Sequence, residues 1–233
     1  MSYKLEMTRR GLIHEAIAAI TLLDAEALDE VRPSTKSENI YNDIDFHGAK
    51  DDEEAMEQLY ASVSVKCQQR ALETGNLSFE LEQQLADGSW VVEQGHHKSK
   101  ATHYAIIVGP TLYYIQRSRL DAYIEVKGWE RVTTLSYAVK DSQKHGKYKD
   151  ARNGLVAISK VPCTLYPIRH GLLRAAELLA KQDIDIEVLR KLGLVSDTLL
   201  YFETVLSHIH KQATGTAEFI ARRLADTLNL IGS

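Results

Sequence analysis

Three charged side chains fall on or beside stretches with the alternating pattern of β-strands. Asp45 lies in "IYNDIDF", Lys66 ends "ASVSVK", and Glu80 lies within "LSFELEQQ". A charge inside a sheet is costly unless it is paired or binds a metal. Two carboxylates can bind Mg²⁺ or Mn²⁺ through oxygen, and such a metal lowers the pKa of a bound water. With a lysine to orient that water or offset phosphate charge, the three residues predict metal-dependent phosphodiester hydrolysis.

The segments around these residues resemble the PD-(D/E)XK, or restriction-endonuclease-like, nuclease superfamily, most closely its phage and mobile-element members. The resemblance lies in the lysine strand "SVSVK", the following "TGNLSFE", Trp90, the segment "KSKA" and the apolar strand that leads to "LYYI". It covers roughly residues 40–120. It implies an α/β fold with a mixed β-sheet core flanked by helices, and a Mg²⁺-dependent (or Mn²⁺-dependent) DNA endonuclease.

The resemblance assigns roles to individual positions. Asp45 would be the first metal ligand, with Asp43 the less favoured choice, and Lys66 would be the catalytic lysine. Lys98 and Lys100 would lie near the metal and contact phosphate, because lysines suit sequence-independent binding to the nucleic-acid backbone.

One position departs from the family pattern. The family has Asp or Glu two residues before the catalytic lysine, where this chain has Ser64. We expect Glu80, on what we take to be the neighbouring strand, to replace that acid, with Glu82 as the second choice because it has the same side-chain parity. If neither reaches the metal, the alternative is a catalytically inactive nuclease-fold protein that binds DNA or protein and acts as a regulator.

A basic segment, "KDSQKHGKYKDAR" at residues 140–152, shows no apolar periodicity and predicts an exposed loop. We expect Lys144, Lys147 and Lys149 to contact the DNA backbone, with Tyr148 available for stacking. A solvated surface loop is the alternative. A zinc site built from the histidines of "GHHKSKATH" is disfavoured, because adjacent histidines seldom reach one ion.

The whole chain has the composition of a folded protein. Its 233 residues are 44% hydrophobic and 26% charged, with a net charge of −4 and two cysteines. We expect an intracellular, cytoplasmic protein without a membrane span. A nuclease-like core is predicted over residues 1–167, and a helical subdomain over residues 168–233. The apolar helices of that subdomain favour bundle packing or a homodimer surface over a DNA-binding helix-turn-helix.

The pattern also predicts the order of elements in the core. We expect a helix at residues 8–28 capped by Thr8, a connector at 32–39, and a strand at 40–46. The acidic stretch 48–60 favours a helix or a solvated loop. Strands follow at 61–67, 77–84, 101–109 and 110–116, the last two antiparallel, then a helix at 117–130 and a final strand at 153–161.

Overall fold

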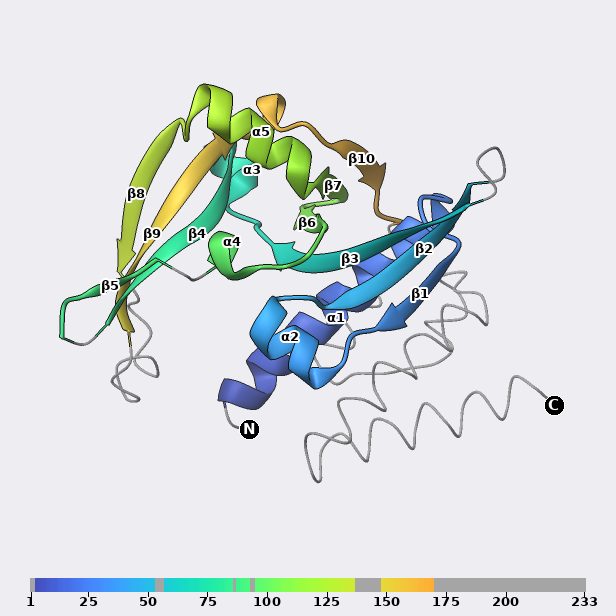
Figure 1. Cartoon of the computed structure of the whole chain (residues 1–233), viewed down its shortest axis with the longest axis horizontal. Coiled ribbons are helices and arrows are strands. Elements are labelled where there is room, and N and C mark those ends of the chain that lie inside the picture. Colours follow the sequence, from blue (N-terminus) through green and yellow to red (C-terminus); the bar gives the residue numbers. More distant parts are fainter. Residues whose placement is uncertain (1–2, 53–56, 86, 93–94, 137–147, 170–233) are drawn as a thin grey trace.

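The computed structural model describes residues 3–52, 57–85, 87–92, 95–136 and 148–169, which form a mixed α/β structure with two sheets (Figure 1). The helices are α1 (Tyr3–Asp24), α2 (Lys36–Asn42), α3 (Ala71–Thr74), α4 (Gly95–Lys98), α5 (Arg117–Lys127) and a 3-10 turn at Ile158–Lys160. The strands are β1 (Glu30–Pro33), β2 (Phe46–Asp52), β3 (Glu57–Cys67), β4 (Asn76–Leu85), β5 (Trp90–Val91), β6 (His103–Val108), β7 (Thr111–Gln116), β8 (Arg131–Ser136), β9 (Tyr148–Ala157) and β10 (Thr164–Pro167). Within the described ranges, no helix is long and apolar enough to cross a membrane.

The larger sheet has six strands in the order β1-β2-β3-β6-β7-β10. Strands β3 and β6 run parallel, and every other neighbouring pair is antiparallel. Helix α1 packs against this sheet at β3 and β6. Strand β6 is buried along almost its whole length, as its continuously apolar sequence predicts for a central strand.

The smaller sheet has four antiparallel strands in the order β5-β4-β9-β8. A buried apolar cluster joins the two sheets. It includes Leu77 and Phe79 of β4, Val156 of β9, and Tyr104 and Ile106 of β6. The two sheets therefore share one core, and this arrangement fixes how β4 lies relative to β3 and β6.

The register of β3 against β6 decides which side chains face the second sheet. Ser64 pairs with Tyr104 and Lys66 pairs with Ile106. Paired residues project to the same face of a sheet. Because Tyr104 and Ile106 belong to the cluster that joins the sheets, Ser64 and Lys66 project toward the second sheet as well.

Several sequence predictions agree with the structure. The strands expected at residues 61–67 and 77–84 lie within β3 and β4, the two apolar strands form the antiparallel pair β6–β7, and α5 follows them. Gly75 ends α3 in a left-handed conformation with φ of 68° and leads into β4. The helical subdomain at residues 168–233 lies almost wholly outside the described residues.

The region before β3 was predicted wrongly. Residues 40–42 belong to α2, so the strand expected at 40–46 begins only at Phe46. A capping box starts this helix, because the Thr35 hydroxyl accepts from the Glu38 backbone N–H while the Glu38 carboxylate accepts from the Thr35 backbone N–H at 2.8 Å. The acidic stretch pairs as β2 and the start of β3, rather than forming a helix or a loop.

Other boundaries were wrong as well. Helix α1 ends at Asp24 and contains Thr8 in its interior, so Thr8 is not its cap. Strand β1 overlaps the start of the expected connector and α2 overlaps its end, and β8 was not predicted. The expected basic loop overlaps β9, which begins at Tyr148, and β10 follows the strand that we expected to be the last.

Candidate functional site

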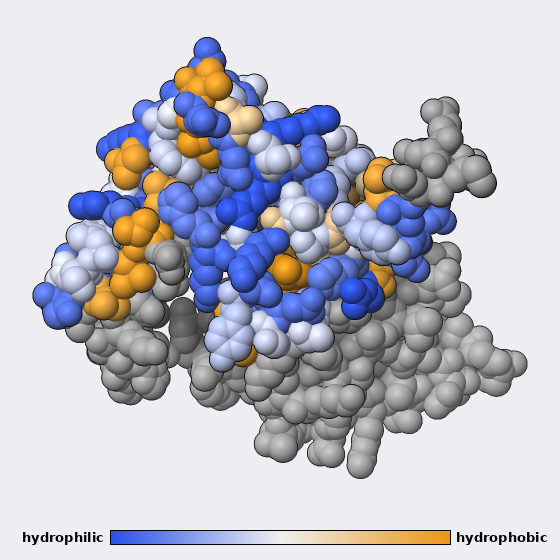
Figure 2. Space-filling model, viewed as in Figure 1, coloured by the Kyte–Doolittle hydropathy of each residue, from blue (hydrophilic) through white to orange (hydrophobic). Residues whose placement is uncertain are grey.

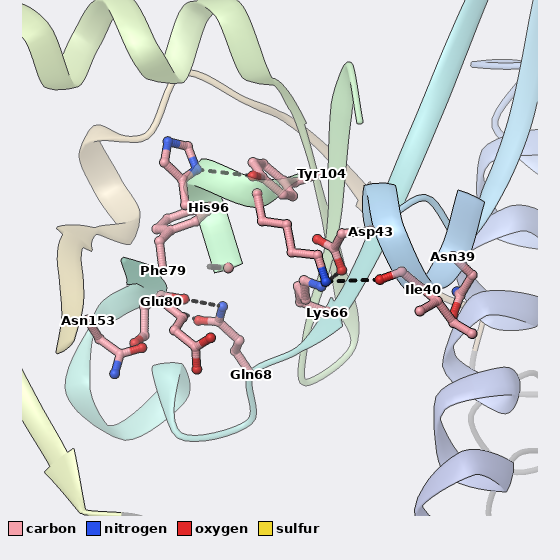
Figure 3. A pocket seen from close by; sticks show the side chains of 13 residues that line it. Asn39, Ile40, Asp43, Lys66, Gln68, Phe79, Glu80, His96, Tyr104 and Asn153 are labelled. Atoms are coloured by element: carbon pink, nitrogen blue, oxygen red, sulfur yellow. Dashed lines mark hydrogen bonds and ion pairs between the residues drawn. The ribbon is translucent and has the colours of Figure 1, made fainter. Parts of the chain in front are cut away.

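A pocket of about 380 Å³ opens between the two sheets (Figure 3). Helix α2, the end of β3, strand β4 and helix α4 supply most of its wall. The lining residues are Asn39, Ile40, Asp43, Lys66, Gln68, Ser78, Phe79, Glu80, Gly95, His96, Lys98, Tyr104 and Asn153. The wall therefore combines acids, lysines and amides with one phenylalanine ring, a composition suited to a charged ligand.

Asp43 and Lys66 form an ion pair on the pocket wall. The Lys66 ammonium donates to Oδ1 of Asp43 at 2.7 Å, and the buried Ser64 hydroxyl donates to Oδ2 at 2.9 Å. Asp43 follows the last residue of α2 and has a φ of 54°, in the left-handed region that Asp tolerates better than most residues. Ser64, for which the sequence resemblance led us to expect an acid, thus binds an acid instead.

Asp45 lies two residues further on and is held by different partners. Its backbone N–H donates to the Val63 carbonyl at 2.8 Å, beside the first residue of β2. Its carboxylate accepts from the Val65 backbone N–H and from the Asn39 amide, both at 2.6 Å. Burial raises the pKa of Asp45, and Asp43 raises it further, whereas Lys66 lowers it. Asp45 is not among the residues that line the pocket, so Asp43 is the aspartate that faces it.

A third carboxylate, Glu15 of α1, was not predicted from the sequence as a site residue. Burial raises its pKa to about 8, the nearby Asp45 raises it too, and Lys66 lowers it. The pattern held a signal, because Glu15 lies on the same helical stripe as Ala19 and Leu22, and both of these are fully buried. An acid on the buried stripe of a helix needs a partner, and here it lies within the electrostatic reach of Asp45 and Lys66.

Glu80 reaches the pocket by a different route from the expected one. Its strand β4 belongs to the second sheet, whereas the neighbours of β3 are β2 and β6, so β4 is not the strand beside Lys66. Nevertheless Glu80 lines the pocket that Asp43 and Lys66 line, and its Oε1 accepts from the Gln83 amide at 2.8 Å. Glu82 does not share this position. A register irregularity separates it from Glu80, and it pairs with Arg152 at 2.9 Å.

The predicted phosphate-binding lysines lie at different places. Lys98 lines the pocket and donates to the Ile40 carbonyl at 2.9 Å, which ties α4 to α2. Lys100 is exposed, and its backbone N–H donates to the Asn42 carbonyl at 2.8 Å. Lys144 and Lys147 lie outside the described residues, as does the side chain of Lys149.

Two further side chains hold the pocket together. Gln68 clamps β4 through its amide, donating to the Ser78 carbonyl at 2.7 Å and accepting from the Ser78 N–H at 2.8 Å. His96 is buried, with Nδ1 3.0 Å from the Tyr104 hydroxyl and Nε2 3.0 Å from the Asp121 carboxylate. Burial lowers the pKa of His96, although Asp121 raises it. Through these two contacts His96 anchors helix α4.

Among the described residues, no group of three or more His, Cys, Asp or Glu side chains is arranged to hold a metal ion. The site instead offers carboxylates in two places, at Asp43 and Glu80 on the pocket wall and at Asp45 and Glu15 nearby. Comparison of the chain with protein-family models, curated proteins and solved structures finds no match. The geometry and charge of the site are therefore the basis on which a function is inferred.

Proposed function

We propose that the protein is a Mg²⁺- or Mn²⁺-dependent DNA endonuclease of the PD-(D/E)XK type, with a restriction-endonuclease-like core. The observation that carries the proposal is the 2.7 Å pair of Lys66 and Asp43 on the wall of an open pocket. Asp43 lies just before β2 and Lys66 at the end of the antiparallel strand β3, so both come to the same end of the sheet.

The donor set of the pocket fits a hard divalent cation. Mg²⁺ is usually held by one or two carboxylates together with waters and substrate phosphates. Asp43 and Glu80 provide two carboxylates on the wall. Asp45 adds negative charge, and its pKa is raised by burial and by Asp43, so a nearby cation would stabilise its ionised form. Asp43 and Glu80 would hold the ion, with Asp45 as the alternative ligand.

A bound Mg²⁺ would supply a water of lowered pKa and positive charge beside the scissile phosphate. The chain's own residues would then act on substrate and water. Lys66, held by Asp43, would orient the attacking water or offset phosphate charge. Lys98 fixes the pocket rim through the Ile40 carbonyl and adds a second positive charge that attracts a phosphate.

Incubation of the purified protein with plasmid and branched DNA, with and without Mg²⁺ or Mn²⁺, tests the proposal. We expect cleavage only with the metal, and its loss in Lys66→Ala with DNA affinity largely kept. Asp43→Asn should also lose cleavage, because the amide keeps the shape but removes the charge that holds the cation. Lys127→Ala, an exposed lysine at the end of α5, is the matched control and should cleave normally. Full activity of Lys66→Ala would refute the assignment.

A second candidate is a nuclease-fold DNA- or protein-binding regulator without catalysis. Ser64 favours it, because this fully buried hydroxyl stands where the family supplies an acid. Calorimetric titration with Mn²⁺ separates the two. The enzyme should bind the ion and Glu80→Gln should lose binding, whereas a parent that binds no divalent ion, with DNA present or absent, would favour the regulator.

A further inference from the structure

A second cavity, of about 430 Å³, lies beside the candidate site and has no role in the chemistry described above. It is formed by the end of β3, helix α3 and the strands β4, β8 and β9. Its wall includes Ala71 and Leu155 as apolar groups and Arg70, Asn76 and Thr133 as polar ones. The exposed surface of the cavity is mostly apolar although most of its lining residues are polar, and such a wall with one guanidinium suits a flat ring that stacks on the guanidinium and bonds through its edge.

The second cavity adjoins the first. Gln68 and Ser78 line both, and the two hydrogen bonds between them make a rigid wall that the cavities share. Strand register also places lining residues of the two cavities next to one another. Ser78 pairs with Leu155, and Glu80 pairs with Asn153. Paired residues, and residues two apart on one strand, share a face of a sheet. The walls that these residues form therefore lie along one face of the four-stranded sheet.

The two cavities differ in charge, and the difference matches the charged phosphate and the uncharged base of one nucleotide. The first holds Asp43, Lys66, Glu80 and Lys98, which suit a phosphate and its cation. The second has no carboxylate among its lining residues and has Arg70 at its wall. A base attached to a phosphate held near Lys66 would meet apolar surface, amides and a guanidinium, all of which suit its face and edges.

We infer that the second cavity binds an unpaired nucleobase of the DNA strand whose phosphate lies in the first pocket. The inference rests on the proposed function, because it takes the phosphate to lie at Lys66. It assigns a substrate class, namely DNA with unpaired nucleotides at the cleavage point, such as a single strand or a flap. A base within a continuous duplex would be paired and stacked, and would enter the cavity only after flipping out.

The test measures binding in metal-free buffer, where no hydrolysis interferes. Fluorescence anisotropy compares a labelled single strand with a strand of the same length whose nucleotides are all abasic, so that the phosphate charge is equal. We expect the intact strand to bind about tenfold more tightly, because a guanidinium such as that of Arg70 over the face of a base contributes an attraction of this order. Thr133→Trp should fill the cavity and remove this preference. Thr134→Trp, on the exposed opposite face of β8, is the matched control and should keep it.

Equal binding of intact and abasic strands by the parent protein would overturn the inference, and this comparison needs no variant to fold. An unchanged preference in Thr133→Trp would also overturn it. If a segment of this chain outside the described residues occupies the cavity, the two strands bind equally. Cleavage assays on the same preparations separate the two proposals. Metal-dependent cleavage without base preference refutes only the inference, and base preference without cleavage refutes only the nuclease.

Discussion

Gly95 is the point where α4 meets the second sheet, and substituting it should be costly. Its φ is 52°, in the left-handed region, and a Cβ there would lie 2.4 Å from the Glu80 carbonyl oxygen and 2.7 Å from the Glu80 Cβ. For Gly95→Ala, the conformation alone costs about 1–2 kcal/mol. Overpacking against a neighbour that is partly backbone adds about 1–3 kcal/mol. We expect a loss of roughly 2–5 kcal/mol in the free energy of unfolding.

Urea denaturation monitored by tryptophan fluorescence measures this loss. Gly75→Ala is the matched control, because Gly75 also has a left-handed φ, of 68°, but an added Cβ would meet nothing within 4 Å. It should lose only the conformational part, about 1–2 kcal/mol. If Gly95→Ala costs no more than Gly75→Ala, the close approach of α4 to Glu80 is refuted. Gly95→Ala should also weaken Mn²⁺ binding, since α4 would push against Glu80.

Three further predictions concern the surroundings of the site. Glu15 has a folded pKa of about 8 against an ordinary 4.5, so the native state holds this proton more tightly than the unfolded chain does. The stability of the parent should therefore fall as pH rises from 4.5 to 8, and Glu15→Gln should remove roughly 4–5 kcal/mol of that fall in urea denaturation across this range. A variant with the same pH dependence as the parent would contradict the raised pKa of Glu15. Gln68→Ala leaves the Ser78 N–H and carbonyl without their partner and should cost about 1–3 kcal/mol, while Gln84→Ala, an outer amide on β4, should cost less. His96→Gln loses contact with Asp121 or Tyr104 and should increase amide hydrogen exchange in α4, and unchanged protection would refute its anchoring role.

The sequence predicted the strands whose burial gives a clear pattern. Strand β6 is almost wholly apolar because both of its faces are covered. Strand β4 alternates because only the face that carries Phe79 packs into the core. The acidic stretch before β3 misled the prediction. Its charges favour helix or loop by composition, yet residues such as Asp51 pair across β2 and β3 at the exposed end of the sheet. Pairing depends on the neighbouring strand, and the composition of a single stretch does not reveal that neighbour.

The candidate site was predicted only in part, because it also depends on how the elements pack together. Lys66 stood out because a lysine at the end of a valine-rich strand is unusual, and the structure brings it to an acid. That acid facing the pocket is Asp43, the less favoured choice, because α2 turns the backbone there into the left-handed region. Glu15 depends on how α1 lies against the sheet, and Glu80 on how the second sheet lies over the first. Helical spacing marks Glu15 only as an acid on the apolar stripe of α1, and it does not show which residues that stripe or β4 will meet.

The path of the chain between the sheets has a consequence for folding and proteolysis. Strands β1 to β3 belong to the larger sheet, β4 and β5 to the smaller, β6 and β7 to the larger again, β8 and β9 to the smaller, and β10 to the larger. Because the parallel pair β3–β6 closes only after β4 and β5 have been passed, neither sheet is a continuous piece of chain. High contact order of this kind slows folding. No single cut between the two sheets would release either as an intact fragment, so limited proteolysis should remove ends of the chain before it separates the sheets.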